Sequence, residues 1–353
     1  MTEPNLDEWK RLYDAAIAFR DLACWRWMWD SDVFAVQDPA DPAGSGTQEI
    51  GYCSVMGALG EFLALAVYPG GEGFALLDKM HADPIGPADE DPEDPFVAFL
   101  EQNCLIASFT SRDDLDKGDL AVIRTLGLRF RGRTAWPQFR SHRPGYAPWR
   151  LEAPEARFLT VALEQAVDVG SRCKERRTLL DPPEGREDAI LTRVPLRRGG
   201  CLAWEDQWLP PAPPSARRTP PAPVVDFRKL DEVERLNLPQ GGTWEMDLVP
   251  FPAFVGKDER PFIPMLLMCV DHASGLVSQP QMAHPDEVHA SLADWITEFF
   301  ITHKTRPETI LFRNPDLHPA LKTIASPLGI AIQRADDLPM LSQARMHLRN
   351  FLG

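Results

Sequence analysis

Apolar residues in the first half of the chain recur with helical spacing in two long segments. Residues 6–24 and 154–176 each place an apolar stripe on one side and charged residues on the other, which predicts amphipathic helices. Shorter helices are expected at residues 74–79, 95–103 and 113–126. Short apolar runs predict strands at residues 33–36, 50–56, 62–68, 105–110, 189–194 and 201–204. This mixture predicts an α+β N-terminal domain with a mainly antiparallel sheet.

The second half shows a more regular alternation of strand and helix patterns. Three apolar runs predict consecutive strands, and the segment after them carries a helical stripe that includes Trp295, Ile296 and Phe300. Strands and helices then alternate to the C-terminus. The expected elements are strands at 243–250, 264–270 and 276–282, a helix at 285–303, a strand at 309–313, a helix at 316–325, a strand at 330–333 and a helix at 338–352. The order βββαβαβα predicts an α/β C-terminal domain with a mixed sheet.

A proline-rich segment separates the two patterns. Seven of the fourteen residues at positions 210–223 are proline, which removes backbone donors and fixes φ, so neither a helix nor a sheet can continue through it. The sequence therefore predicts three parts: an α+β domain at residues 1–209, a linker at 210–223 and an α/β domain at 224–353.

Composition narrows the class of protein. The chain has 353 residues and a formal net charge of −15, which opposes general binding to nucleic acid, because that binding depends on Lys and Arg neutralising phosphates. No apolar run reaches the roughly 18–20 residues of a membrane span, and the N-terminus lacks the features of a secretory signal. Six cysteines are scattered singly. We expect a cytoplasmic protein with reduced cysteines and no membrane association.

Three segments of the second half resemble the catalytic cores of RNase H-like transposases and integrases. The segments are Trp244-Glu245-Met246-Asp247, the turn Asp271-His272-Ala273-Ser274-Gly275, and the run from Arg306 to Asn314. The resemblance implies an RNase H-like fold and, in an active member, Mg²⁺ or Mn²⁺ held by carboxylates. The candidate catalytic residues are Asp247, Asp271 and Asp316.

The sequence departs from that pattern where the chemistry needs acids. Asn314 stands in the place of the second acidic residue, with Asp316 two positions later, and the helix expected at 338–352 contains no Asp or Glu. Because two-metal catalysis needs several carboxylates around the ions, these departures favour a degenerate core. No metal site and no cofactor are expected in that case.

The whole chain also resembles an uncharacterised bacterial family made of two adjacent domains of unknown function. The matching segments are Gly51–Gly57 with Gly60-Glu61, Val67–Gly70, Arg143–Trp149 and Arg260-Pro261-Phe262 with Val270-Asp271. This resemblance spans nearly the full chain and implies no activity.

The segment from Arg124 to Arg150 is the candidate binding surface. It holds seven arginines, no acidic residue and several aromatic residues. Arginine beside aromatic rings suits single-stranded nucleic acid or a phosphate-bearing ligand, so Arg140, Arg143, Tyr146 and Trp149 are the candidate binding residues. In the alternative interpretation, the arginines pair with the surplus carboxylates and the aromatic rings anchor the segment.

Two hypotheses about function follow. The first is a non-catalytic binding or interaction protein, with a protein partner or a phosphate-bearing ligand. The second is a metal-dependent nuclease or phosphoryl-transfer enzyme that uses Mg²⁺ or Mn²⁺ at the three aspartates. The sequence favours the first.

Overall fold

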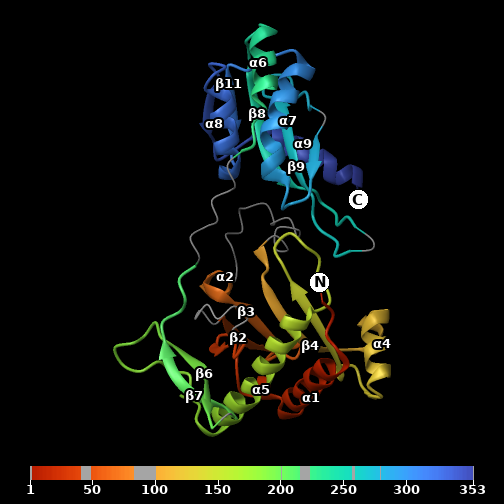
Figure 1. Ribbon diagram of the computed structural model, residues 1–353, viewed down its shortest axis with the longest axis vertical. Coiled ribbons are helices and arrows are strands. Elements are labelled where there is room, and N and C mark those ends of the chain that lie inside the picture. Colours follow the sequence, from red (N-terminus) through yellow and green to blue (C-terminus); the bar gives the residue numbers. More distant parts are fainter. Residues whose placement is uncertain are drawn as a thin grey trace. The chain divides into compact units, whose positions relative to one another are not determined.

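The computed structural model divides into two compact units, which are described separately (Figure 1). It describes residues 2–40, 49–82, 101–199, 201–214, 223–256, 259–278 and 280–352. The first unit holds the described residues up to 144 and from 148 to 214. The second holds those from 223 onward together with residues 145–147. The sequence analysis had assigned residues 145–147 to the first domain.

The first unit is built on a seven-stranded mixed sheet. Its strands, in spatial order, are β5 (Trp136–His142), β4 (Cys104–Thr110), β3 (Leu63–Pro69), β2 (Ile50–Met56), β1 (Phe34–Gln37), β6 (Ile190–Arg198) and β7 (Cys201–Leu209). All neighbours are antiparallel except β1 and β6, which run parallel. The prediction of a mainly antiparallel sheet in an α+β domain is therefore confirmed at the level of strand direction.

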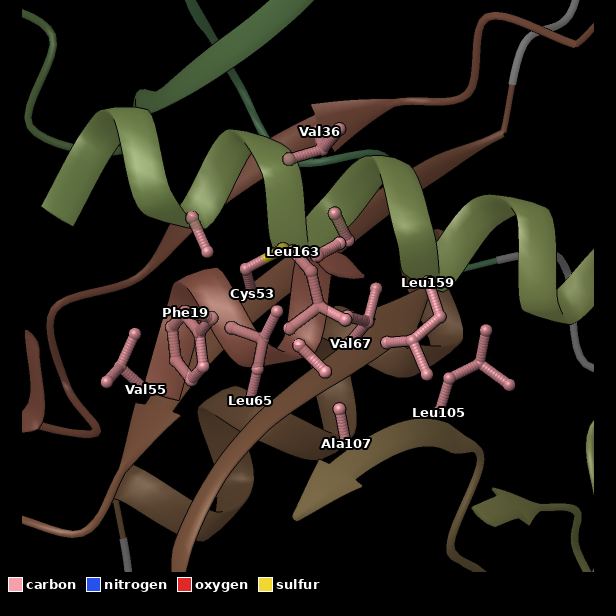
Figure 2. Close-up of a cluster of buried hydrophobic side chains, with 14 of the residues drawn as sticks. Phe19, Val36, Cys53, Val55, Leu65, Val67, Leu105, Ala107, Leu159 and Leu163 are labelled. Carbon is pink, nitrogen blue, oxygen red and sulfur yellow. The ribbon is translucent and has the colours of Figure 1, made fainter. Parts of the chain in front are cut away.

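Two helices, α1 (Leu6–Leu22) and α5 (Ala153–Glu175), pack against each other and cover one face of this sheet (Figures 1 and 2). Phe19, Leu159 and Leu163 from the helices meet Cys53 and Leu65 from the strands in the main core. The opposite face is covered by α2 (Gly70–Ala82), whose Leu77 is buried beside Tyr52 and Tyr68. The alternation of side chains along each strand thus supplies both apolar layers.

Capping residues fix where the two long helices begin. The Asn5 side chain accepts hydrogen bonds from the backbone N–H groups of Asp7 and Glu8, and the Glu8 side chain accepts one from Asn5. At the start of α5, Glu152 and Glu155 form the same reciprocal arrangement. These boxes satisfy N–H groups that have no partner within the helix.

The second unit is built on a five-stranded mixed sheet. Its spatial order is β10 (Gln281–Ala283), β9 (Met265–Asp271), β8 (Thr243–Pro250), β11 (Thr309–Phe312) and β12 (Ala331–Arg334). The strands β8, β11 and β12 run parallel to one another, whereas β9 runs antiparallel to β8 and β10. Among the described residues of this unit, the helices beside the sheet are α6 (Phe227–Arg235), α7 (Val288–His303), α8 (His318–Ala325) and α9 (Pro339–Leu352). The predicted order βββαβαβα is confirmed, with α6 preceding it.

Several predicted elements differ from the structure. The third strand of the second half, expected at 276–282, is described as Gln281–Ala283, and before it Val277 forms an isolated antiparallel bridge with Val270. The edge strand β5 was not predicted, because the alternation of buried and more exposed positions along it is not matched by an alternation of apolar and polar residues. The helix expected at 113–126 is the 3-10 turn Arg112–Asp114 followed by α4 (Lys117–Thr125). Most of the helix expected at 95–103 lies outside the described residues. No described helix is both long and apolar enough to span a membrane.

The beginning of the proline-rich segment packs on the first unit. The Ala212 N–H donates a hydrogen bond of 2.7 Å to the Tyr52 hydroxyl. At Gly71, in the first turn of α2, a Cβ atom would overlap with the backbone of Pro213, so only glycine permits this approach. Helix α2 therefore begins at Gly70, four residues before the start at 74 that the sequence predicted.

Candidate functional site

Asp247 lies in the middle of β8, the central strand of the second sheet. It is 1% exposed, and burial raises the pKa of its carboxyl group, although the Asn314 N–H and the Arg313 guanidinium oppose that rise. Its Oδ1 accepts a 2.9 Å hydrogen bond from the backbone N–H of Asn314, and its Oδ2 lies 3.3 Å from Nη2 of Arg313. Both oxygens are thus engaged by the residues that follow β11.

Glu245 is a buried carboxylate that the sequence analysis did not single out. It is two positions before Asp247 and therefore on the same face of β8. It is fully buried; its Oε1 lies 2.6 Å from Nδ1 of His272, and its Oε2 accepts a 2.8 Å hydrogen bond from the N–H of Leu341. Leu341 is in the first turn of α9, so Glu245 joins the central strand to the last helix. The alternation in Trp244-Glu245-Met246-Asp247 was the signal that could have identified it.

Asp271 does not lie beside Asp247. In the ladder between β8 and β9, Asp271 pairs with Trp244 while Asp247 pairs with Met268. This offset of three residues corresponds to roughly 10 Å along the strands. The Asp271 carboxylate accepts hydrogen bonds from the N–H and the hydroxyl of Ser274, at 2.9 and 2.5 Å, and so holds the turn after β9.

Asp316 lies in a short 3-10 turn, Pro315–Leu317, and its backbone N–H donates a 3.0 Å hydrogen bond to the side-chain oxygen of Asn314. Within the part of the chain that the structure describes, no three His, Cys, Asp or Glu side chains are arranged to hold a metal ion. The structure therefore does not bring Asp247, Asp271 and Asp316 together as such a group of three.

The two predicted binding arginines of the first unit are paired with carboxylates. Arg140 on β5 forms a bidentate contact with Asp119, at 2.7 and 2.9 Å. Burial lowers the pKa of the Arg140 guanidinium, but the contact with Asp119 outweighs burial and the pKa is raised. Arg143 contacts Glu152 at 2.5 Å and Glu155 at 2.9 Å, at the first turn of α5. These contacts match the alternative interpretation, in which the arginines pair with surplus carboxylates.

The two predicted aromatic residues lie in different units. Trp149 exchanges two backbone hydrogen bonds with Ser141 in the first unit. Tyr146 belongs to the second unit, where its hydroxyl donates a 2.6 Å hydrogen bond to Asp286 and lies 3.3 Å from Nε2 of His284. The four predicted residues therefore do not form one surface of a single unit.

Two adjoining cavities in the first unit were not predicted. They measure about 430 and 510 Å³ and share Asp38, Ala40 and Arg157 as lining residues. Glu49 lines the larger one, and the backbone N–H of Asp38 donates to the Glu49 carbonyl. Burial raises the pKa of both carboxyl groups, and the charge of Asp38 adds to the rise at Glu49. Asp38 follows β1 and Glu49 precedes β2, and no motif in the sequence around them indicated a cavity.

The cations of these cavities already have acidic partners. Arg157 lies 2.6 Å from Glu8, and Arg143 is held by Glu152 and Glu155. Among the described residues, the Asp38 side chain accepts the N–H of Ala40 and is affected by the positive charge of Arg157, whereas Glu49 forms no ion pair. The described residues that line the two cavities include five carboxylates (Asp7, Glu8, Asp38, Glu49 and Glu155) and three arginines (Arg11, Arg143 and Arg157), so the net charge of this lining is negative.

Comparison with protein families matches the two halves of the chain separately. Residues 9–193 match a domain of unknown function, DUF7309, and residues 230–349 match a second, DUF6930. The chain belongs to the DUF7309 family. Its matched region covers the first unit from α1 to β6, and the DUF6930 region covers the second sheet and its helices.

Comparison with curated proteins found no match. Among solved structures, the chain is similar to the crystal structure of the catalytic core domain of BIV integrase, at 13% sequence identity and a TM-score of 0.21. The match covers 31% of this chain and 64% of that chain.

Proposed function

We propose that this DUF7309-family protein is a non-catalytic binding protein whose second unit is an RNase H-like scaffold. The strand order supports the fold assignment. Counted from β8 in chain order, the sheet reads 3-2-1-4-5, and only the second strand, β9, runs against the others. This is the order and direction of strands in RNase H-like folds.

The contacts of Asp247 are the observation on which the non-catalytic assignment rests. In two-metal phosphoryl transfer, the carboxylate oxygens must face the ions together with further acidic ligands. Here one oxygen accepts the N–H of Asn314, the other faces Arg313, and the side chain is almost fully buried. The carboxylate therefore joins β8 to the chain after β11 and is not available to an ion.

A cleavage assay tests this assignment. Labelled single-stranded DNA, double-stranded DNA and RNA are incubated with the full chain in 5–10 mM Mg²⁺ or Mn²⁺, in parallel with Asp247→Asn and with Glu308→Gln as an exposed control. We expect no cleavage above that of the buffer. Cleavage that is present in the wild type and the control and lost in Asp247→Asn would contradict the proposal.

The adjoining cavities of the first unit are the proposed binding site of this protein. Their volumes fall in the usual range of roughly 300–1,000 Å³ for small-molecule sites. Glu49 forms no ion pair with a described residue, and burial raises the pKa of Asp38 despite the nearby charge of Arg157, so the ligand we expect carries an amine. An ammonium group between the two carboxylates would favour their ionised forms.

Thermal unfolding with and without spermidine or L-lysine tests this site. We expect either amine to raise the Tm of the wild type and of Arg112→Ala, an exposed control, and to have less effect on Glu49→Gln. An equal Tm shift in all three proteins, or none with either amine, would contradict the site.

A further inference from the structure

The second unit contains a small cavity of about 180 Å³ between β9 and α7. Leu267 and Cys269 lie on the same face of β9, and Trp295 and Phe299 lie one turn apart on α7. Burial raises the pKa of the Cys269 thiol far above its ordinary value, so the thiol stays neutral. These four residues form the apolar part of the wall, and the polar part is formed by Ser278, Gln281, Glu298, Thr302 and His303.

A serine and a histidine provide a hydrogen-bonding group in this cavity. Ser278 is 6% exposed, and its hydroxyl lies 3.0 Å from Nε2 of His303. The His303 ring packs on Phe299 and Trp244, with ring centres 4.8 and 5.8 Å apart, which fixes its orientation. A hydroxyl both donates and accepts, so the bond to His303 leaves Ser278 able to make another bond with a molecule in the cavity.

Size and charge limit what this cavity can hold. A cavity of about 150 Å³ lined by apolar side chains holds one benzene ring, so a volume of 180 Å³ suits one ring with a small substituent. Glu298 also lines the cavity and is exposed, so its negative charge disfavours anions. We infer that this cavity is a binding site for a neutral one-ring molecule whose hydroxyl group bonds to Ser278.

A ligand titration by NMR tests this inference, with phenol as the probe and toluene and benzoate as comparators. We expect phenol to bind the full-length wild type more tightly than toluene does, and benzoate not to bind. Ser278→Ala should weaken phenol about tenfold, the effect of one lost hydrogen bond, and change toluene less than twofold. Ser342→Ala, at an exposed position on α9, should bind like the wild type.

A second variant separates loss of the site from loss of the fold. Thr302 lines the cavity and is exposed, so Thr302→Trp should reduce phenol and toluene binding together without lowering the Tm. No phenol binding to the wild type, or equal phenol affinity in the wild type and Ser278→Ala, would overturn the inference. Either outcome leaves the results of the metal and amine experiments unchanged, because those concern Asp247 and the first unit.

Discussion

The two units stabilise buried charge in different ways. In the first unit, the buried Arg193 on β6 is held by side chains: its guanidinium contacts Asp206 at 2.5 Å, Asp168 at 3.3 Å and the Gln165 carbonyl oxygen at 3.0 Å. In the second unit, the buried Glu245 and Asp247 each combine one side-chain contact, with His272 and Arg313, with a hydrogen bond from a backbone N–H, that of Leu341 or Asn314.

This difference changes how the charges respond to protons. Asp206 is hydrogen-bonded to Arg172 and Arg193, which lower the pKa of its carboxyl group despite partial burial. Burial dominates at Asp247 and raises its pKa. The first arrangement stabilises the fold through a carboxylate whose pKa is lowered, whereas the second joins elements of the fold through a carboxylate whose pKa is raised.

The largest expected effect in this comparison is at Arg193. Arg193→Ala removes one buried partner and leaves Asp206 and Gln165 less satisfied, so the free energy of unfolding should fall by about 3 kcal/mol. Urea unfolding of the full chain measures this change. Arg197→Ala, an exposed position on the same strand, should change stability by less than about 0.5 kcal/mol. Equal effects of the two variants would contradict the role of the ion-pair network.

An intermediate effect is expected at Glu245. Glu245→Gln removes the negative charge that faces the Leu341 N–H and His272 and turns one acceptor oxygen into an N–H₂ donor, so both buried hydrogen bonds are weakened. The free energy of unfolding should fall by about 1–2 kcal/mol. Glu308→Gln, which is exposed, serves as the matched control. An unchanged free energy of unfolding in Glu245→Gln would show that the link to α9 does not stabilise the unit.

The smallest effects, measured against pH, distinguish the two arrangements most clearly. The pKa of Asp206 is lowered by folding, so its contribution to stability is present above the unfolded-state pKa and is lost as pH falls through the folded-state pKa. The stability difference between the wild type and Asp206→Asn should therefore shrink on acidification. Urea unfolding at pH 7 and at two or three lower pH values measures it.

The opposite sign is expected at Asp247. Its pKa is raised by folding, so the folded state binds a proton more tightly, and the wild type should gain stability relative to Asp247→Asn as pH falls through that raised pKa. At pH 7, the difference between these two proteins should be within about 1 kcal/mol, because loss of the Arg313 contact is offset by removal of a buried charge. A change with pH in the same direction for both pairs of proteins would contradict the comparison.

The sequence predicted most of the apolar elements because their periodicity follows directly from burial. The stripe of α5 and the apolar runs of β8 and β9 needed no information from distant residues. The edge strand β5 was missed because its pattern contains Arg140, Gln138 and His142 on one face, which only pairing with β4 makes regular. Helix α6 was missed because seven of its nine residues are not buried and only Leu230 and Val233 mark its inner face.

The candidate site was less predictable, because it depends on contacts between distant residues. The sequence placed Asp247 on the first strand of the second sheet. Its partners Arg313 and Asn314 follow a strand more than sixty residues later, and only the parallel pairing of β8 and β11 brings them together. The cavities around Asp38 and Arg157 likewise arise where α1, α5 and the β1–β2 hairpin meet.

Titration of Mn²⁺ into the full chain by isothermal titration calorimetry, at pH 7 and beside Asp247→Asn, tests the central claim most directly. Since both oxygens of Asp247 are engaged within the fold, the wild type and the variant should give the same heats, with no binding that depends on this carboxylate. Binding of one or two Mn²⁺ ions per chain that disappears in Asp247→Asn would contradict the claim that the second unit is a non-catalytic scaffold.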